Sequence, residues 1–468
     1  MLFNSLDFAL FFAVVYAAYL LLPLRGQNRM LLVASYFFYG CWDYRFLSLI
    51  ALSTTVDFLL AQRIHDSGDP RRRKRLLLAS MALNLGVLGF FKYFNFFVGS
   101  AEALARSFGF EPEGLRLHIV LPVGISFYTF QSMSYTIDVY RRQLVPTRSL
   151  VDYALFVSLF TQLVAGPIER ASHLLGQVTA PRTVRWEGIQ TGAWLFFWGL
   201  FKKVVIADNM AVIVDSVFAG DVAWTTASVL IGVYAFALQI YCDFSAYSDM
   251  ARGLGFFMGF DIMVNFRNPY FALNPSDFWR RWHISLSTWL RDYLYIPLGG
   301  NRNGPRRTYV NLMLTMVLGG LWHGAAWTFV WWGVFHGALL AAHRWVRGDR
   351  ADAPMSGFGR IWRIVAMFHA VCFSWLLFRA ASMQDVTGML AALVQRPEWH
   401  AECGVWLLQI AVLGAPLFLV QVLQERWSDP LAPMKLSLFP RVALYGVLLV
   451  MLVSLANTGS RAFIYFQF

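Results

Sequence analysis

Long apolar segments recur along the whole chain and are separated by short polar loops. Residues 8–24 carry no charge and come close to the ~20 residues that an α-helix needs to cross a bilayer. Residues 31–62 are too long for one crossing and are interrupted by polar residues at 40–45, which predicts two helices. Further crossings are expected at residues 194–207, 224–241, 311–343, 364–378, 405–422 and 442–455. The short segment 151–164 ends before Pro167, and we expect it to be re-entrant.

The charges that flank these segments predict how the chain crosses the membrane. Asp7 precedes the first apolar segment, whereas Arg25 and Arg29 follow it. The loops at residues 63–75 and 141–148 are also basic, and the loop that follows residue 99 is acidic on balance. Because cytoplasmic loops carry the excess of Lys and Arg, this alternation predicts an N-terminus on the outer side of the membrane.

The composition agrees with an all-α polytopic membrane protein and excludes a soluble one. Only 14% of the 468 residues are charged, and 58% are hydrophobic, whereas soluble domains carry about 25% charge. The net charge of +12 is explained by cytoplasmic loops and anionic membrane lipids, so it does not imply nucleic acid as a partner. No stretch is long and polar enough for a soluble domain. We therefore expect residues 1–468 to form one membrane domain with about 11–13 transmembrane or re-entrant helices.

Residues 274–295 carry a mixed aromatic and polar pattern that predicts one amphipathic helix. Asn274 is a suitable N-cap, and Pro275 suits the first helical position. Aromatic residues recur every three or four positions on one face. The other face carries Arg280, His283, Ser287 and Arg291. This polar face either lies at the lipid headgroups, as in interfacial helices, or lines a cavity inside the protein.

Residues 308–342 contain no Asp, Glu, Lys or Arg, but they contain His323 and His336. An ionisable side chain at bilayer depth is costly, so each histidine is a candidate functional residue. For His336 we favour an ordinary hydrogen bond within the core. His323 has the stronger case, since Gly324 follows it and leaves room for a backbone or a substrate to approach. On one straight helix the two histidines would lie about 220° apart and would not share a face.

Two carboxylates, Asp243 and Asp249, follow the apolar segment 224–241 within a run that is rich in hydroxyls. Hard metal ions need more converging oxygen ligands than this, and the four cysteines show no CxxC spacing. We therefore predict no metal site and give the two carboxylates a structural role at helix ends or beside an Arg or His. No GxSxG, P-loop, HExxH or GxGxxG motif occurs in the required context. The chemistry that these residues best permit is a neutral histidine acting as general base toward an attacking hydroxyl or thiol.

Several short motifs together resemble the membrane-bound O-acyltransferase family, and most of all its bacterial branch that acetylates exopolysaccharides such as alginate and cellulose. The motifs are Leu121–Phe127, Ala165–Ile168, Asp243–Ser245, Phe278–Ser285, Leu298–Arg302, Trp322–Gly324 and the closing Phe463–Phe468. The resemblance implies a ring of tilted helices around a central tunnel. It also implies that His323 is the catalytic histidine and that His283 is the second histidine near the tunnel, with Arg280, Ser287, Arg291, Asp243, Asp249 and His336 as further tunnel candidates.

The same resemblance implies a donor, a partner and a location in the bacterial inner membrane. Acetyl-CoA is the expected donor from the cytoplasm, with no tightly bound cofactor. A periplasmic SGNH-type acetyltransferase is the expected partner, within an exopolysaccharide synthesis and secretion complex. Asn301 and Arg302 match a loop motif of the family, and Arg302, Arg306 and Arg307 are candidates for binding the CoA phosphates. A plain basic loop on the cytoplasmic side is the account of these arginines that we favour.

Two other functions remain open from the sequence. A transporter that moves an acyl carrier or a glycan without making bonds is compatible with aromatic-rich, interrupted helices. Within the family, transfer of D-alanine to teichoic acid is a further alternative. The polymer, the acyl group and the oligomeric state are not determined by these patterns.

Overall fold

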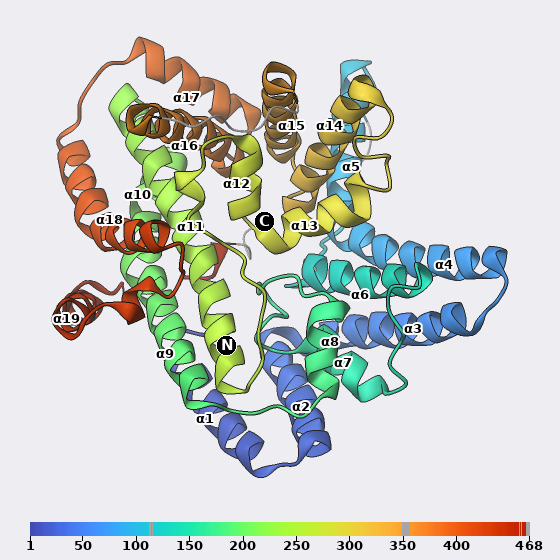
Figure 1. The fold of residues 1–468 in the computed structure, drawn as a ribbon. Coiled ribbons are helices and arrows are strands. Elements are labelled where there is room, and N and C mark those ends of the chain that lie inside the picture. Colours follow the sequence, from blue (N-terminus) through green and yellow to red (C-terminus); the bar gives the residue numbers. More distant parts are fainter. Residues whose placement is uncertain (112–113, 115, 349–355, 458, 460, 465–468) are drawn as a thin grey trace. The chain divides into compact units, whose positions relative to one another are not determined.

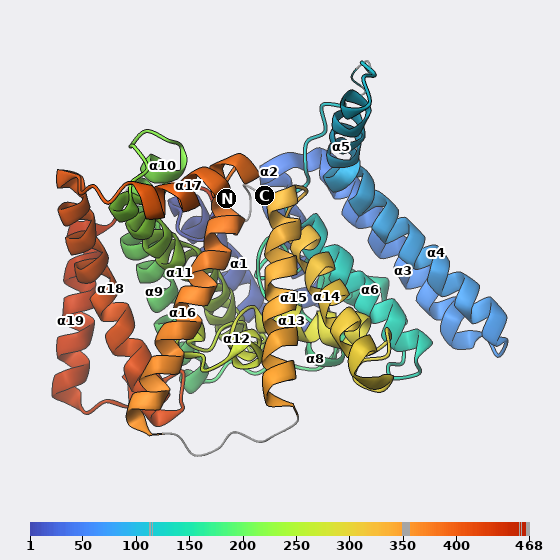
Figure 2. The ribbon, with the colours of Figure 1, turned by 90° about the horizontal axis from the view of Figure 1, so that it is seen from above.

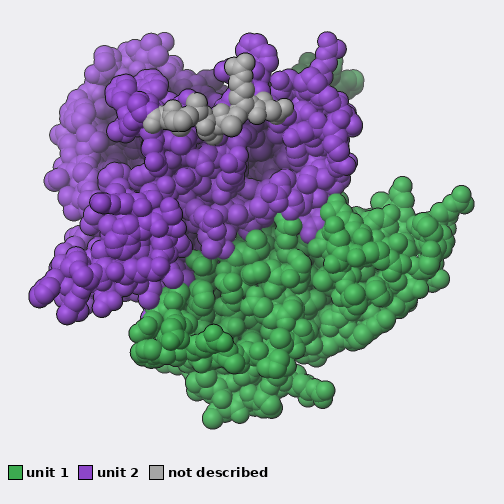
Figure 3. Space-filling view, in the orientation of Figure 1, with its two compact units in different colours: residues 1–192, 251–263 green, residues 193–250, 264–468 purple. Residues whose placement is uncertain are grey.

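The computed structural model of the chain describes residues 1–111, 114, 116–348, 356–457, 459 and 461–464. Every regular element in these residues is a helix (Figures 1 and 2). The chain forms two compact units, which are coloured separately in Figure 3. Unit 1 comprises residues 1–192 and 251–263, and unit 2 comprises residues 193–250 and 264–468. The expectations of one membrane domain and of a ring around a tunnel stay predictions.

Unit 1 is built from apolar helices and shorter connecting helices. Among them α3, α4 and α6 lie side by side in both Figure 1 and Figure 2. The elements are α1 (Leu6–Leu21), α2 (Leu24–Asp43), η1 (Tyr44–Phe46), α3 (Leu47–Asp66), α4 (Pro70–Leu88), η2 (Gly89–Tyr93), α5 (Phe94–Ser107), α6 (Ile125–Tyr140), α7 (Leu150–Ser158) and α8 (Ala171–Thr179). The first part of α9 (Trp186–Phe201) and the end of α11 (Thr226–Phe257) also belong to unit 1.

Hydrogen bonds between buried polar side chains join α3 to α4. The Asp57 carboxylate accepts hydrogen bonds from Ser80 Oγ at 2.6 Å and from Asn84 Nδ2 at 2.8 Å. Ser53 Oγ donates to the Asn84 amide oxygen at 2.8 Å. Polar side chains that bond one another across apolar helices stabilise such pairs, because lipid offers them no alternative partner.

The two glycine-containing motifs of unit 1 meet at Gly124. This residue has a positive φ of 76° and directly precedes α6. A Cβ atom there would lie 2.5 Å from the carbonyl oxygen of Leu163, in the segment before Gly166 and Pro167. Only glycine combines this backbone conformation with this close approach, which explains why the motif Leu121–Phe127 contains a glycine at this position.

Unit 2 contains the other part of α9 and α11 and all of the later helices. Its elements are η3 (Lys202–Ala207), α10 (Asp208–Phe218), η4 (Pro269–Phe271), α12 (Pro275–Arg281), α13 (Ile284–Leu290), η5 (Arg291–Tyr295), α14 (Gly304–His323), α15 (Trp327–Arg347), α16 (Gly357–Arg379), α17 (Met383–Gln395), α18 (Ala401–Trp427), η6 (Ala432–Lys435) and α19 (Leu438–Leu455). Helices α14 and α15 form a tight hairpin (Figures 1 and 2). A Cβ on Gly333 of α15 would lie 2.5 Å from the carbonyl oxygen of Met316, so the backbones pack directly.

The helices confirm an all-α polytopic membrane protein. Within the described residues, six helical stretches are long and apolar enough to cross a membrane, and α1 is a shorter apolar helix. The expected break at residues 40–45 is confirmed, since α2 ends at Asp43 and α3 begins at Leu47. Two bounds were wrong: the apolar segment 224–241 continues as one helix to Phe257, and segment 311–343 is divided between α14 and α15. The number of crossings stays a prediction, and residues 465–468 of the closing motif lie outside the described residues.

The prediction of one helix over residues 274–295 was wrong, although its N-cap is confirmed. Asn274 Oδ1 accepts a hydrogen bond from the backbone N–H of Asp277 at 2.8 Å. The helix then stops at Arg281, and His283 adopts the left-handed conformation with φ 43° and ψ 54°. Here the Ile284 N–H donates to the backbone carbonyl of Asn265 at 2.9 Å instead of to a helical partner. Hydrogen bonds to a distant segment therefore replace those of the helix.

Candidate functional site

The two histidines of the family-like motifs lie together inside unit 2. His323 is the last residue of α14, and His283 occupies the break between α12 and α13. Their ring centroids are 6.3 Å apart. His283 is fully buried and His323 is 3% exposed. The structure thus brings together the two residues that the sequence singled out as catalytic, and both come from helix ends, where the backbone departs from regular geometry.

Asn265 holds His283 in place, and sequence reasoning missed it. Its amide oxygen accepts hydrogen bonds from the backbone N–H of Ser285 at 3.2 Å and from Ser285 Oγ at 2.9 Å. The same oxygen lies 3.2 Å from His283 Nδ1. Because a backbone N–H only donates, this oxygen is an acceptor, and His283 Nδ1 carries the proton. Neutral His283 therefore presents a lone pair at Nε2.

The segment that carries Asn265 is itself anchored to α11. Asn265 is buried, and its amide nitrogen donates to Ser248 Oγ at 3.3 Å. Phe244 of the same helix packs edge-on against His283, with ring centroids 4.6 Å apart. The motif around Asp243–Ser245 thus supports His283 through an aromatic contact and a hydrogen-bonded asparagine.

Aromatic side chains enclose His323. The rings of Trp322, Trp332 and Phe378 have centroids 5.0, 5.1 and 5.3 Å from the imidazole. A Cβ on Gly324 would lie 2.0 Å from the ring of Phe329. The glycine after His323 therefore makes room for Phe329 of α15, and not for a substrate as we expected.

His336 lies beside this site but outside the pair. Its ring is fully buried against Trp279 and Trp332, with centroids 5.0 and 4.6 Å away. Among the described residues neither of its ring nitrogens has a hydrogen-bond partner. The expected hydrogen bond within the core is therefore not present in the described part of the chain. His323 on α14 and His336 on α15 both contact the ring of Trp332. The two histidines therefore lie on different helices of the hairpin.

The other candidates on residues 274–295 do not gather around the histidines. Arg280 and Arg291 are exposed, and the Arg291 Nε atom pairs with the Asp292 carboxylate at 2.7 Å. Ser287 Oγ donates to the carbonyl oxygen of Trp282 at 3.0 Å. The prediction of a common polar face was wrong because the chain changes direction at His283, between α12 and α13.

The candidate donor-binding residues lie on the surface of unit 2 between η5 and the start of α14. Asn301, Arg302, Arg306 and Arg307 are all exposed. Tyr295 donates a hydrogen bond to the Asn301 side chain, and buried Asn311 donates to the Gly300 carbonyl at 3.0 Å. These bonds hold the loop in a defined shape, and its arginines stay accessible to a soluble anion.

Asp243 and Asp249 form ion pairs with lysines, and not with the Arg or His that we expected. Lys203 Nζ lies 2.8 Å from carboxylate oxygens of both Asp208 and Asp243, and Lys202 Nζ lies 2.7 Å from Asp249. Both lysines lie on the π-helix η3 and are buried. Sequence reasoning missed them, although two charges within the apolar segment 194–207 are an available signal.

The same cluster anchors the end of the described chain. Asp243 Oδ2 accepts a hydrogen bond from the backbone N–H of Ile464 at 2.6 Å. The Phe463 ring lies 5.7 Å from that of Phe244, which in turn contacts His283. The C-terminal motif and the Asp243–Ser245 motif therefore support the histidine site together.

Comparisons with known proteins place this chain in a family. The profile of the membrane-bound O-acyltransferase family matches residues 140–383, a span that contains both His283 and His323. The chain is 44% identical over 439 residues to a probable alginate O-acetylase of Azotobacter vinelandii, which covers 92% of this chain and 87% of that protein. It is also 44% identical over 402 residues to a probable alginate O-acetylase of Pseudomonas aeruginosa, covering 86% of this chain and 76% of that protein.

A more distant relative acts on a different polymer. The chain is 36% identical over 427 residues to the peptidoglycan O-acetyltransferase of Helicobacter pylori, with 84% of this chain and 80% of that protein covered. Identities of this size over most of both chains extend beyond the family motifs. Together with the apolar helices, they show that this chain is an acyltransferase and belongs to the membrane-bound O-acyltransferase family.

Proposed function

We propose that this protein transfers an acetyl group from acetyl-CoA toward the hydroxyl groups of an exported polysaccharide, with His323 as the general base. The observation that carries the proposal is the buried pair of His283 and His323, with ring centroids 6.3 Å apart. The names of the relatives support O-acetylation of a polysaccharide, because alginate and peptidoglycan are both glycans.

The proposed reaction needs one proton acceptor and one positioning group. The oxygen of the acceptor's hydroxyl attacks the acetyl carbonyl carbon and forms a bond to it. His323 accepts the proton of that hydroxyl in the same step. The C–S bond then breaks, and the CoA thiolate takes the proton back from His323. His283 orients the hydroxyl through the lone pair at Nε2, since Asn265 holds the proton on Nδ1.

The burial of the site limits which acyl groups reach it. His323 is enclosed by Trp322, Trp332 and Phe378, so these side chains must turn aside before a thioester can approach. A two-carbon acetyl group requires a smaller displacement than a long acyl chain. The enclosure therefore favours acetyl over longer donors, and it excludes water that would hydrolyse the thioester.

The proposal also includes a direction and a partner. Acetyl-CoA approaches from the cytoplasm, where the exposed Arg302, Arg306 and Arg307 attract its phosphates. The acetyl group leaves on the periplasmic side to an SGNH-type acetyltransferase within a polysaccharide synthesis and secretion complex. We place the protein in the bacterial inner membrane with its N-terminus in the periplasm, as the positive-inside pattern indicates.

Turnover by the purified protein tests this function. We expect protein in sealed proteoliposomes to release CoA thiol from labelled acetyl-CoA added outside when a periplasmic SGNH-type acetyltransferase and a soluble glycan are enclosed inside. The label should appear on the glycan in equal amount. Label that crosses the bilayer while the thioester stays intact would contradict the proposal and would favour a transporter.

Replacing Asn265 tests how His283 is positioned. In the Asn265→Ala variant His283 loses the partner of its Nδ1 proton, so the ring is free to turn or to change tautomer. We expect kcat to fall roughly 10-fold to 100-fold, because a misplaced group costs on the order of 100-fold. The KM for acetyl-CoA should stay within about twofold.

An asparagine at a different place in unit 2 provides the control for this variant. Asn209 also donates from its side chain to backbone carbonyls, those of Val205 and Leu455. The Asn209→Ala variant should keep the kcat of the wild type. Its loss of thermal stability should be comparable to that of Asn265→Ala. Equal loss of kcat in both variants would assign Asn265 a merely structural role.

A further inference from the structure

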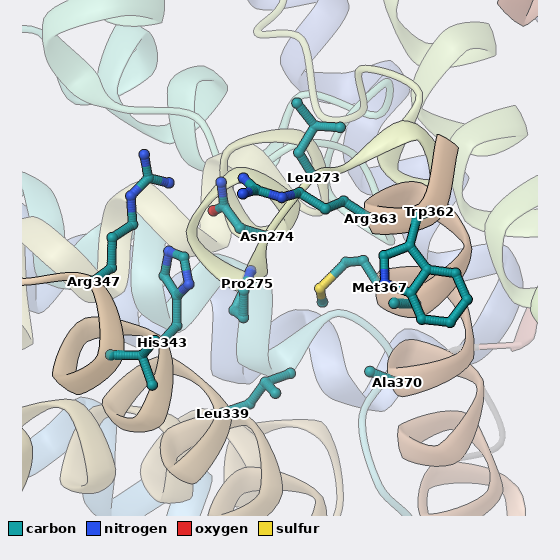
Figure 4. A pocket seen from close by; sticks show the side chains of 12 residues that line it. Leu273, Asn274, Pro275, Leu339, His343, Arg347, Trp362, Arg363, Met367 and Ala370 are labelled. Carbon is teal, nitrogen blue, oxygen red and sulfur yellow. The ribbon is translucent and has the colours of Figure 1, made fainter. Parts of the chain in front are cut away.

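An open cavity in unit 2 has no part in the proposed chemistry. It lies between the end of α15, the start of α16 and the start of α12, and its volume is about 530 Å³ (Figure 4). This volume falls in the range of about 300–1,000 Å³ that is typical of small-molecule sites. None of the residues around His283 and His323 lines it.

The lining of the cavity is divided between cationic and apolar groups. In Figure 4 the polar ends of Arg347, Asn274 and Arg363 lie in the upper half, together with Leu273, and Leu339 and Ala370 lie in the lower half. His343 also lines the cavity. Guanidinium groups bind phosphate oxygens through paired hydrogen bonds, so the upper half suits a phosphate and the lower half suits a hydrocarbon group.

The surface around the opening identifies the environment of the cavity. Trp362 lines the cavity and is 65% exposed, and on α15 Trp345 and Val346 are 76% and 77% exposed. Phe358 near the start of α16 is also largely exposed. Exposed Trp beside Arg is typical of the headgroup level of a bilayer, where one part of a side chain meets hydrocarbon and another meets water. A cavity that opens at this level would lie within reach of lipid headgroups.

We propose that this cavity binds an anionic phospholipid. Arg347 and Arg363 bind the headgroup phosphate, with Asn274 as a further hydrogen-bond donor. The glycerol and the first carbons of the acyl chains lie against Leu339 and Ala370.

Lipid retention by the purified protein tests this proposal. Native mass spectrometry compares the protein in detergent with added phosphatidylglycerol and with added phosphatidylethanolamine. We expect the wild type to retain phosphatidylglycerol in preference to phosphatidylethanolamine. The Arg347→Gln/Arg363→Gln double variant should bind phosphatidylglycerol roughly 30-fold more weakly, at roughly fivefold for each arginine. Arg360→Gln, an exposed arginine near the start of α16 that does not line the cavity, should bind as the wild type does.

Two further measurements keep the proposal falsifiable if the double variant folds poorly. Ala370→Trp fills the lower half without changing the charge, and it should weaken phosphatidylglycerol binding while Arg360→Gln does not. Acetyl-CoA is then added to the wild type with bound phosphatidylglycerol. Displacement of the lipid by acetyl-CoA, or equal retention of both phospholipids, would overturn the proposal. Loss of lipid selectivity with intact acetyl-CoA turnover in the double variant would support it, independently of the proposed acetyl transfer.

Discussion

The His323→Ala variant should lose acetyl transfer almost completely while it stays inserted in the membrane at normal abundance. A positioned general base contributes roughly 100-fold to 10,000-fold to a rate, and His323 is the histidine at the centre of the aromatic enclosure. We therefore expect kcat to fall by roughly 1,000-fold, within that range. The measurement is release of CoA thiol from acetyl-CoA by equal amounts of purified protein.

A histidine elsewhere in unit 2 provides the matched control. His369 on α16 is exposed and lies 3.0 Å from the Tyr234 hydroxyl, away from the pair. His369→Ala should turn over acetyl-CoA at the wild-type rate. Undiminished turnover in His323→Ala would rule out this histidine as the base, and His283, whose Nε2 carries a lone pair, would then be the remaining candidate.

The Lys203→Met variant should be the least stable of the single substitutions considered. Lys203 pairs with Asp208 and Asp243 at 2.8 Å each, and all three side chains are buried. Methionine removes the cation and leaves two buried carboxylates without their shared partner. Such a loss costs about 3–5 kcal/mol of unfolding free energy. We expect the midpoint of thermal unfolding in detergent to fall by roughly 10 °C.

The same substitution at an exposed ion pair is the control. Lys435 pairs with Asp429 at 2.6 Å, but its side chain is 66% exposed. Lys435→Met should change the unfolding free energy by less than about 1 kcal/mol, since water screens an exposed pair. If Lys203→Met and Lys435→Met lower the midpoint of thermal unfolding equally, burial is not the reason that the Lys203 cluster stabilises the protein.

The two variants separate catalysis from support of the site. Asp243 also binds the backbone of Ile464, and its neighbour Phe244 contacts His283. Damage to the Lys203 cluster should therefore lower both stability and activity, whereas His323→Ala lowers activity alone. A stable Lys203→Met protein without activity would instead assign Lys203 a direct part in the reaction.

Features that depend on neighbours in the sequence were predicted well. The polar residues at 40–45 marked the division between α2 and α3, because an apolar helix that crosses a membrane does not tolerate such a run without a break. Asn274 and Pro275 marked the start of α12, because capping is decided within one helical turn. His323 stood out since ionisable groups are rare in apolar segments.

Features that depend on distant residues were not predicted. Asn265 is eighteen residues from His283, in a segment without periodic pattern, and nothing local marks it as a partner. Lys202 and Lys203 meet carboxylates on another helix. The break at His283 was also missed, because the aromatic and polar periodicity of residues 274–295 is compatible with one uninterrupted helix.

The sequence by itself determined that this is an all-α membrane protein, and its short motifs singled out His283 and His323. Hydropathy and capping depend on residues that are close in the sequence, so both can be read along the chain. Only the tertiary structure decided that the two rings meet, that Asn265 sets the tautomer of His283 and that α12 stops where it does. Each of these is a pairing of buried polar or aromatic groups, and such pairings depend on which segments come together when the chain folds.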